Sequence, residues 1–347
     1  MSDAFTLTHL GTAPLLPYRA PRMLSPLGPR RFRPTALFAP RAIALLGGES
    51  DLGQRILGNI RQAGFPGALH VIDDPADLAP GTDLAVIASP DPQPSLDTLA
   101  AKGVGAAILA APGGTICPNA LPLLGPGAFG VIVPGAKLNV SAAHLPVRPG
   151  RLALVSPSAA LCRTVLDWAE PNGVGFSHVV GTGLEADIDA ADILDFLSRE
   201  PGTGAILLDI RTIKDRRAFM SAARAAARLR PVVALRAGGR QHDPTGRGER
   251  VFEAALRRAG ILRVATMAEL LAAAEILTRA RPPRTEALMI VSNAISAGQL
   301  AADQAIRLGI PLASLDPAAQ TLMCMRLPPQ PADSGLVWTG DDDPTRL

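Results

Sequence analysis

Short, wholly apolar segments alternate with amphipathic segments along most of the chain, and this alternation is the strongest constraint on the fold. Residues 42–46 (AIALL), 83–88 (DLAVIA) and 205–210 (AILLDI) have the length and apolar content of strands that are buried on both faces. Residues 51–63 instead place apolar side chains at helical spacing. Buried strands that alternate with helices predict a parallel sheet covered on both sides, so the fold class is α/β.

The pattern runs through the chain twice, which predicts two consecutive doubly wound Rossmann/flavodoxin-like domains. We expect the first domain over residues 37–149, including a strand at 129–133, and the second over residues 150–283. A Pro- and Arg-rich extension occupies residues 1–36, and a truncated third α/β unit and tail occupy residues 284–347. In that last unit the strand and helix signals fade after residue 310.

Composition excludes several classes of protein. Apolar residues make up 48% of the chain, too many for a disordered chain, and aromatic residues only 3%, too few for base-stacking nucleic-acid modules. No window of about 18 uninterrupted apolar residues occurs, so no membrane span is expected. The three cysteines, Cys117, Cys162 and Cys324, lie far apart and predict buried thiols in a reducing cytoplasm.

A Gly-rich turn between the first strand and the first helix is one candidate binding site. Gly47, Gly48, Ser50 and Gly53 would let backbone amides approach a phosphate at a helix N-terminus, although a simple strand-to-helix turn also explains them. Asp73, near the end of the second strand, would hold a ribose in an NAD-binding domain, or would simply form a turn with Asp74 and Pro75. We favour the turn.

Polar groups follow the strands of the second domain as well. Ser156 is expected to cap a helix whose first residue is Pro157, with Ser158 beside it; this segment is either a second phosphate site or an ordinary cap. The acids Glu185, Asp187 and Asp189 follow a strand, where they either face a ligand or cap a helix.

One histidine stands in a Gly-rich polar loop. His242 lies in residues 238–248 (GGRQHDPTGRG), between an expected strand and an expected helix. An exposed loop histidine is usually without a role, but its place just beyond a sheet edge makes His242 the candidate catalytic residue.

In this order, the motifs resemble the ADP-forming acyl-CoA synthetases, which share CoA-binding and ligase domains with the succinyl-CoA synthetase alpha subunit, and the synthetase-like region of protein lysine acetyltransferases. The resemblance is carried by residues 37–47 (LFAPRAIALLG), 83–90 (DLAVIASP), 151–168 (RLALVSPSAALCRTVLDW) and 251–271 (VFEAALRRAGILRVATMAELL). It implies a CoA site that includes Ser89 and Pro90, and a phosphohistidine at His242 that relays a phosphoryl group to the acid substrate.

Several departures from the family pattern point to a degenerate active site. Arg211 replaces the family's glutamate, Pro157 and Ala159 replace residues of its Ser-Gln-Ser-Gly phosphate turn, and the histidine loop is short. No ATP-grasp segment is present, so ATP or ADP would be bound only through a partner, and no metal is expected in this chain.

Three functions stay open. We expect a protein that binds CoA or a nucleotide as a non-catalytic or partner-dependent subunit. The alternative is an active alpha-type subunit that uses His242 with an ATP-grasp beta-type partner in trans. An NAD-dependent oxidoreductase is disfavoured, since no catalytic His–Asp or Tyr–Lys pair stands out. A homo-oligomer is left open, and neither a nucleic acid nor a membrane is expected as a partner.

Overall fold

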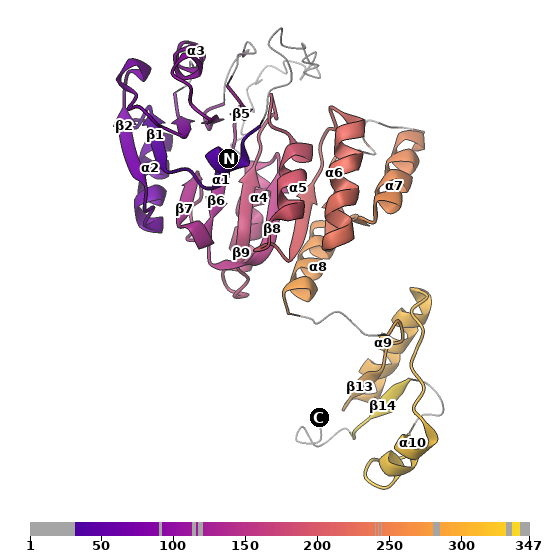
Figure 1. The fold of residues 1–347 in the computed structure, drawn as a ribbon. Helices are drawn as coiled ribbons and strands as arrows, with labels where there is room; N and C mark the ends of the chain where they lie inside the picture. The colour runs from indigo at the N-terminus through magenta and orange to yellow at the C-terminus, as the bar shows by residue number, and fades with distance from the viewer. Residues whose placement is uncertain are drawn as a thin grey trace, which may run out of the picture. The chain divides into compact units, whose positions relative to one another are not determined.

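The computed structural model describes residues 32–89, 92–112, 116, 121–239, 241, 243, 245–279, 285–330 and 335–340 (Figure 1). The chain divides into two compact units between Ala280 and Arg281. The expected α/β class is confirmed, and both large sheets lie in the first unit. Pro90, Cys117 and His242 fall outside the described residues, as does the extension up to residue 31.

The first sheet has five parallel strands in the order β2-β1-β3-β4-β5. This order is that of a flavodoxin-like doubly wound sheet. The strands are β1 (Ala42–Leu46), β2 (Ala68–Ile72), β3 (Leu84–Ile87), β4 (Ala106–Leu109) and β5 (Leu123–Leu124). The helical segments between and before them are α1 (Pro34–Phe38), α2 (Asp51–Ala63), η1 (Pro75–Asp77) and α3 (Gln93–Ala101).

The second sheet has seven strands in the order β12-β11-β10-β8-β9-β6-β7. Its parallel part repeats the flavodoxin-like order, with β9 on one side of the first strand, β8, and β10 on the other. The strands are β6 (Gly130–Val133), β7 (Leu138–Ser141), β8 (Pro149–Ser156), β9 (Phe176–Gly181), β10 (Ala205–Asp209), β11 (Val232–Leu235) and β12 (Leu262–Val264), with η2 (Pro134–Ala136) between β6 and β7.

Helices cover both faces of the second sheet, because alternate strand residues point to opposite sides. Ile206 and Leu208 pack in the same core cluster as residues of α5, α6 and α7, whereas Leu207 packs with residues of α4 and α8. The helices are α4 (Ala159–Ala169), α5 (Ala190–Arg199), α6 (Arg216–Leu229), α7 (Arg247–Ala259) and α8 (Met267–Arg279).

The expected strand at 129–133 forms, but its placement in the first sheet is wrong. Its core, β6, pairs antiparallel with β9 and with β7, which was not foreseen, so both strands extend the second sheet. The pairing with β9 requires a glycine at position 181. A Cβ on Gly181 would lie 2.2 Å from Cβ of Phe129, so a larger residue would keep the two strands apart. Asn59 of α2 donates hydrogen bonds of 2.9 Å to the carbonyls of Ser141 and Ala143, which ties the first domain to this edge.

The second unit contains a small two-stranded parallel sheet, β13 (Ile290–Ser292) with β14 (Leu336–Trp338), and the helices α9 (Ile295–Arg307) and α10 (Pro317–Cys324). The expectation that regular structure fades after residue 310 is therefore wrong. The side chain of Asp316 accepts a 2.7 Å hydrogen bond from the Ala319 amide and so begins α10. In the part of the chain that the structure describes, no helix is long and apolar enough to cross a membrane.

Candidate functional site

Each large sheet has one topological switch point, where the chain leaves two neighbouring strands in opposite directions and opens a crevice at their carboxyl ends. In the first sheet this point lies between β1 and β3, and in the second between β8 and β10. The candidate residue Ser156 ends β8, and Gly47, Ser89 and Ser158 lie one or two residues beyond the ends of β1, β3 and β8. The candidate ligand-binding residues therefore lie at the carboxyl ends of two separate sheets. We call the carboxyl end of the first sheet, at β1 and β3, edge 1, and that of the second sheet, at β8 and β10, edge 2.

At edge 1 the Gly-rich turn packs closely against the end of β3. A Cβ on Gly47, whose φ is +75°, would lie 3.1 Å from the Ser89 amide nitrogen. A Cβ on Gly53 would lie 2.2 Å from the Gly47 carbonyl oxygen, so this position accepts only glycine. The Ser50 hydroxyl donates to the Gly47 carbonyl at 2.8 Å and accepts from the Gly53 amide at 3.0 Å. The turn thus brings Gly47, Ser50, Gly53 and Ser89 together.

Two further residues of the turn have defined surroundings. The space beside Gly48 is filled by Val71 of β2, whose Cγ1 would be 2.6 Å from an added Cβ, and Gln54 donates to the Gly48 carbonyl at 2.7 Å. Asp74 accepts a 2.7 Å hydrogen bond from the Ala76 amide and starts η1, while Asp73 is exposed. The turn interpretation of Asp73-Asp74-Pro75 is confirmed.

Edge 2 is closed by a buried carboxylate. The Ser156 hydroxyl donates a 2.8 Å hydrogen bond to Oδ2 of Asp209, the last residue of β10, and both side chains are buried. The expectation that Ser156 caps the helix is wrong: Ser158 caps α4, its hydroxyl accepting from the Leu161 amide at 3.2 Å. The Ser158 amide in turn donates to the Ser156 hydroxyl at 2.9 Å.

These contacts occupy two of the amides near the start of α4. Pro157 has no amide hydrogen, and the Ser158 and Leu161 amides already donate to serine hydroxyls. Burial raises the pKa of the Asp209 carboxyl, while the Ser156 hydrogen bond and Arg211 lower it in part. Sequence reasoning missed Asp209, although one carboxylate that ends an otherwise apolar strand was a visible signal.

A second buried carboxyl follows β9. Glu185 is 6% exposed, has a φ of +55°, and accepts a 2.9 Å hydrogen bond from the Thr182 hydroxyl. Burial raises its pKa from 4.5 to about 7, against the lowering effect of the Thr182 hydrogen bond. Of the three acids expected at this edge, Glu185 is the one whose carboxyl is buried and whose pKa lies near neutral pH.

The other two acids are structural. Asp189 caps α5 in a reciprocal capping box with Asp192, as the capping interpretation predicts. Asp187 accepts a 3.2 Å hydrogen bond from the Leu123 amide. The same loop donates from the amides of Leu184 and Ala186 to the carbonyls of Pro126 and Gly125 at 2.9 and 2.7 Å, so it binds the loop after β5.

The loop that contains His242 is described only around it. Asp243 accepts hydrogen bonds from the Glu249 amide at 2.9 Å and from the Thr245 hydroxyl at 3.0 Å, which lower its pKa. The buried Glu249 carboxylate pairs with Arg236 at 2.6 Å and with Arg263. These contacts anchor the loop to α7, and the role of His242 itself stays a prediction.

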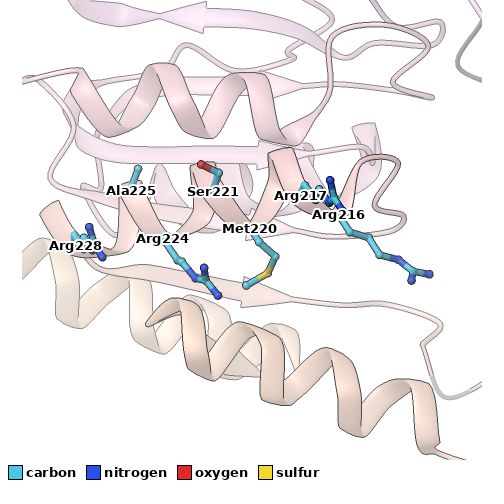
Figure 2. Close-up of a pocket in the computed structure, with 7 residues that line it drawn as sticks. All are labelled: Arg216, Arg217, Met220, Ser221, Arg224, Ala225 and Arg228. Carbon is cyan, nitrogen blue, oxygen red and sulfur yellow. The ribbon is translucent and has the colours of Figure 1, made fainter. Parts of the chain in front are cut away.

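The outer face of α6 carries a basic groove of about 550 Å³ (Figure 2). Among the described residues, none of its four arginines forms an ion pair, and the helix contains no acid. The groove is lined by Arg216, Arg217, Met220, Ser221, Arg224, Ala225 and Arg228. It contains neither a nucleophile paired with a base nor a Gly-rich turn, so we do not regard it as the candidate site.

Cysteines and metal ligands add no further chemistry to either edge. Cys162 is buried in α4, and burial raises the pKa of its thiol to about 12. Cys324 is exposed, so the expectation of buried thiols is wrong for that residue. Within the described ranges, no three His, Cys, Asp or Glu side chains are grouped as a metal site.

Two doubly wound sheets, each with polar groups at its switch point, define the chain as a tandem Rossmann-type protein. Residues 149–277 match the model of the succinyl-CoA ligase like flavodoxin domain. The alpha subunit of an ADP-forming acetate–CoA ligase I from Pyrococcus furiosus is 28% identical over 80% of this chain and 70% of its own length. An ADP-forming acetate–CoA ligase I from Archaeoglobus fulgidus is 29% identical over 81% of this chain and 47% of its own length.

A solved structure shares the fold. The dinucleotide-forming acetyl-coenzyme A synthetase 1 of Ca. Korarchaeum cryptofilum, in complex with phosphate and ADP, superposes with a TM-score of 0.79 at 23% identity, over 89% of this chain and 76% of that one. The chain is therefore similar to the ADP-forming acetate–CoA ligases over most of its length, and to the succinyl-CoA ligase like flavodoxin domain over residues 149–277. It spans about half the length of the longer relative from Archaeoglobus fulgidus.

Proposed function

We propose that the chain is a CoA-binding, alpha-type subunit whose own phosphoryl-transfer site is degenerate, so that it acts as a non-catalytic or partner-dependent subunit. The observation that carries this proposal is the hydrogen bond between Ser156 and Asp209 at edge 2. A carboxylate at the start of α4 repels a phosphoryl group from the helix end that would otherwise attract it.

The neighbouring departures act in the same direction. Pro157 removes an amide donor, and Arg211 stands where the family's glutamate would orient the histidine and stabilise its cation. The loss of one well-placed donor for a developing charge reduces a rate by about 10²–10³. Several such losses together argue against efficient phosphorylation of His242.

The geometry of edge 1 supports our proposal of a CoA site there. Position 53 of its Gly-rich turn has room for glycine only. The turn leads into the N-terminus of α2 and lies beside Ser89. Both curated relatives are named as CoA ligases, and we propose that CoA binds here. We further propose that ATP or ADP is bound only by an ATP-grasp partner, that the chain needs no metal of its own, and that it resides in the cytoplasm.

The CoA site predicts opposite effects of two charge changes. Ser89→Asp places a carboxylate next to Gly47 and should weaken CoA binding more than about tenfold, because it repels the phosphates. Glu49→Gln removes an exposed acid from the same turn and should strengthen binding by roughly two- to fivefold. Isothermal titration calorimetry with CoA measures both, and Glu253→Gln on the exposed face of α7 is the control. Equal affinity in all four proteins would refute this site.

Phosphoryl transfer is tested directly. The full chain is incubated with [γ-³²P]ATP and an ATP-grasp subunit, with the Pyrococcus furiosus alpha subunit as the active control. We expect no acid-labile label on this chain, because edge 2 does not accept the phosphoryl group. Label that appears on the wild-type chain and disappears in His242→Ala would instead establish the alternative, an active alpha-type subunit with a phosphohistidine.

A further inference from the structure

A cavity of about 420 Å³ lies at the amino ends of β8 and β9, the sheet edge opposite to edge 2. Because these strands are parallel, their first residues meet at one edge. The cavity is bordered by α1, by η2 and by the end of α5. Its lining includes Phe38, Gly135, Gly150, His178, Phe196 and Glu200. The volume is within the range of small-molecule sites.

Aromatic rings form one wall. Phe38 of α1 stacks on Phe196 of α5 with ring centroids 4.3 Å apart and an interplanar angle of 11°. The His178 ring stands edge-on to both rings, at 5.5 and 5.4 Å. Such a cluster offers flat apolar surface and ring edges, which favour another planar ring.

His178 is the polar group of this wall that lacks a partner. It is 4% exposed, and among the described residues neither ring nitrogen has a hydrogen-bond partner; Nδ1 is fully enclosed. Burial lowers the pKa of His178 to about 4, and Glu200 only partly opposes this, so the ring is neutral at pH 7. A neutral imidazole carries one donor and one acceptor. Nδ1 is enclosed without a partner among the described residues, so Nε2 is the ring nitrogen that a molecule in the cavity can meet.

The other polar side chains select against anions. Ser177 is already paired with the Thr203 hydroxyl at 2.9 Å and the Leu152 carbonyl at 3.3 Å. Glu200 contributes a carboxylate to the lining, and the described lining residues include no Arg or Lys. A phosphate or carboxylate ligand would meet only negative charge here, so this cavity does not suit CoA or a nucleotide.

We propose that the cavity is a second ligand site, separate from both carboxyl-end edges, which binds a small, uncharged, planar heteroaromatic molecule against the wall that Phe38, Phe196 and His178 form. The ligand's ring N–H or ring nitrogen pairs with the imidazole. Its carbon skeleton takes the apolar space beside Phe38 and Phe196.

The test compares two probes of similar shape. Benzimidazole has a ring N–H and a ring acceptor, whereas indene has neither. We expect calorimetry at pH 7.5 to show benzimidazole binding roughly five- to tenfold more tightly, the worth of about one hydrogen bond. Long-range ¹H–¹⁵N spectra should show the His178 ring nitrogens shifting with benzimidazole and moving much less with indene.

Two variants make the result decisive. His178→Phe keeps a ring but removes both nitrogens, so the preference for benzimidazole should disappear while indene still binds. Phe196→Ala removes one ring of the aromatic wall and should weaken the binding of both probes. Thermal unfolding and unchanged CoA binding verify that the variants are folded. Absence of any benzimidazole-induced shift at His178, or binding of both probes that is unchanged in Phe196→Ala, would overturn the proposal without touching the CoA site.

Discussion

Glu185→Gln should stabilise the protein above neutral pH by roughly 2–3 kcal/mol, because one unit of pKa displacement corresponds to about 1.4 kcal/mol. The pKa of Glu185 is raised from 4.5 to about 7 by burial, so the folded state holds this proton more tightly than the unfolded state. Between these two pH values the free energy of unfolding therefore falls as pH rises, and above about 7 the loss is complete. Glutamine retains the oxygen that accepts from Thr182 but cannot ionise.

The measurement is urea unfolding of wild type and variant between pH 4.5 and 8.5, read as the difference between the two proteins. That difference should be small at pH 4.5, grow to about pH 7 and then stay constant. Glu253→Gln, which changes a carboxylate whose side chain is 49% exposed, should give no such curve. A difference that is independent of pH would show that the pKa of Glu185 is the same in the folded and unfolded states, which would contradict this prediction.

Ser156→Ala should lower the free energy of unfolding by roughly 1–3 kcal/mol, because it leaves the buried Asp209 carboxyl without its hydroxyl donor and the Ser158 amide without its acceptor. In the Asp209→Asn background the cost of Ser156→Ala should be smaller, since a neutral amide is less costly to leave unpaired. Urea unfolding of the two single variants and the double variant gives the coupling energy.

Ser221→Ala on the exposed face of α6 is the matched control and should change stability by less than about 0.5 kcal/mol. Additive effects of Ser156→Ala and Asp209→Asn would contradict the pairing. A loss of coupling would also remove the main support for the degenerate phosphoryl-transfer site, because the Ser156–Asp209 contact is what places negative charge at α4.

The local pattern was sufficient for most helices and strands, since burial periodicity is a local property. Residues 42–46 and 51–63 form the predicted elements as β1 and α2, and the strand predicted at 205–210 forms as β10 over residues 205–209. Sheet membership is a long-range property. The local sequence of β6 is compatible with a strand in either sheet. Only its hydrogen-bonded partner, β9, determines that it belongs to the second sheet. The missed strand β12 has one buried residue, Val264, so its pattern carried little signal.

The sequence was sufficient to predict which sheet ends carry the candidate residues. It was not sufficient to predict which side chains contact one another there. Sequence placed Gly47, Gly53 and Ser89 after neighbouring strands, and the structure brings them together. It could not tell which serine would cap α4, because Ser156 and Ser158 are equally suitable by type, and the choice follows from Asp209 holding the Ser156 hydroxyl. His178 was not among the candidate residues, because the surroundings of its ring depend on packing against Phe38 of α1 and Phe196 of α5.

The antiparallel pair β6–β7 limits how this architecture can be divided. Both strands precede the matched residues 149–277, yet β6 supplies the neighbour that β9 has on the side away from β8. A segment restricted to the matched range would present β9 as an open edge, with unpaired amides and carbonyls ready to join another chain. In evolutionary terms, the module that can be exchanged between proteins is larger than the recognisable domain. It must bring the β6–β7 hairpin with it, and α2 is hydrogen-bonded to the residues that end that hairpin.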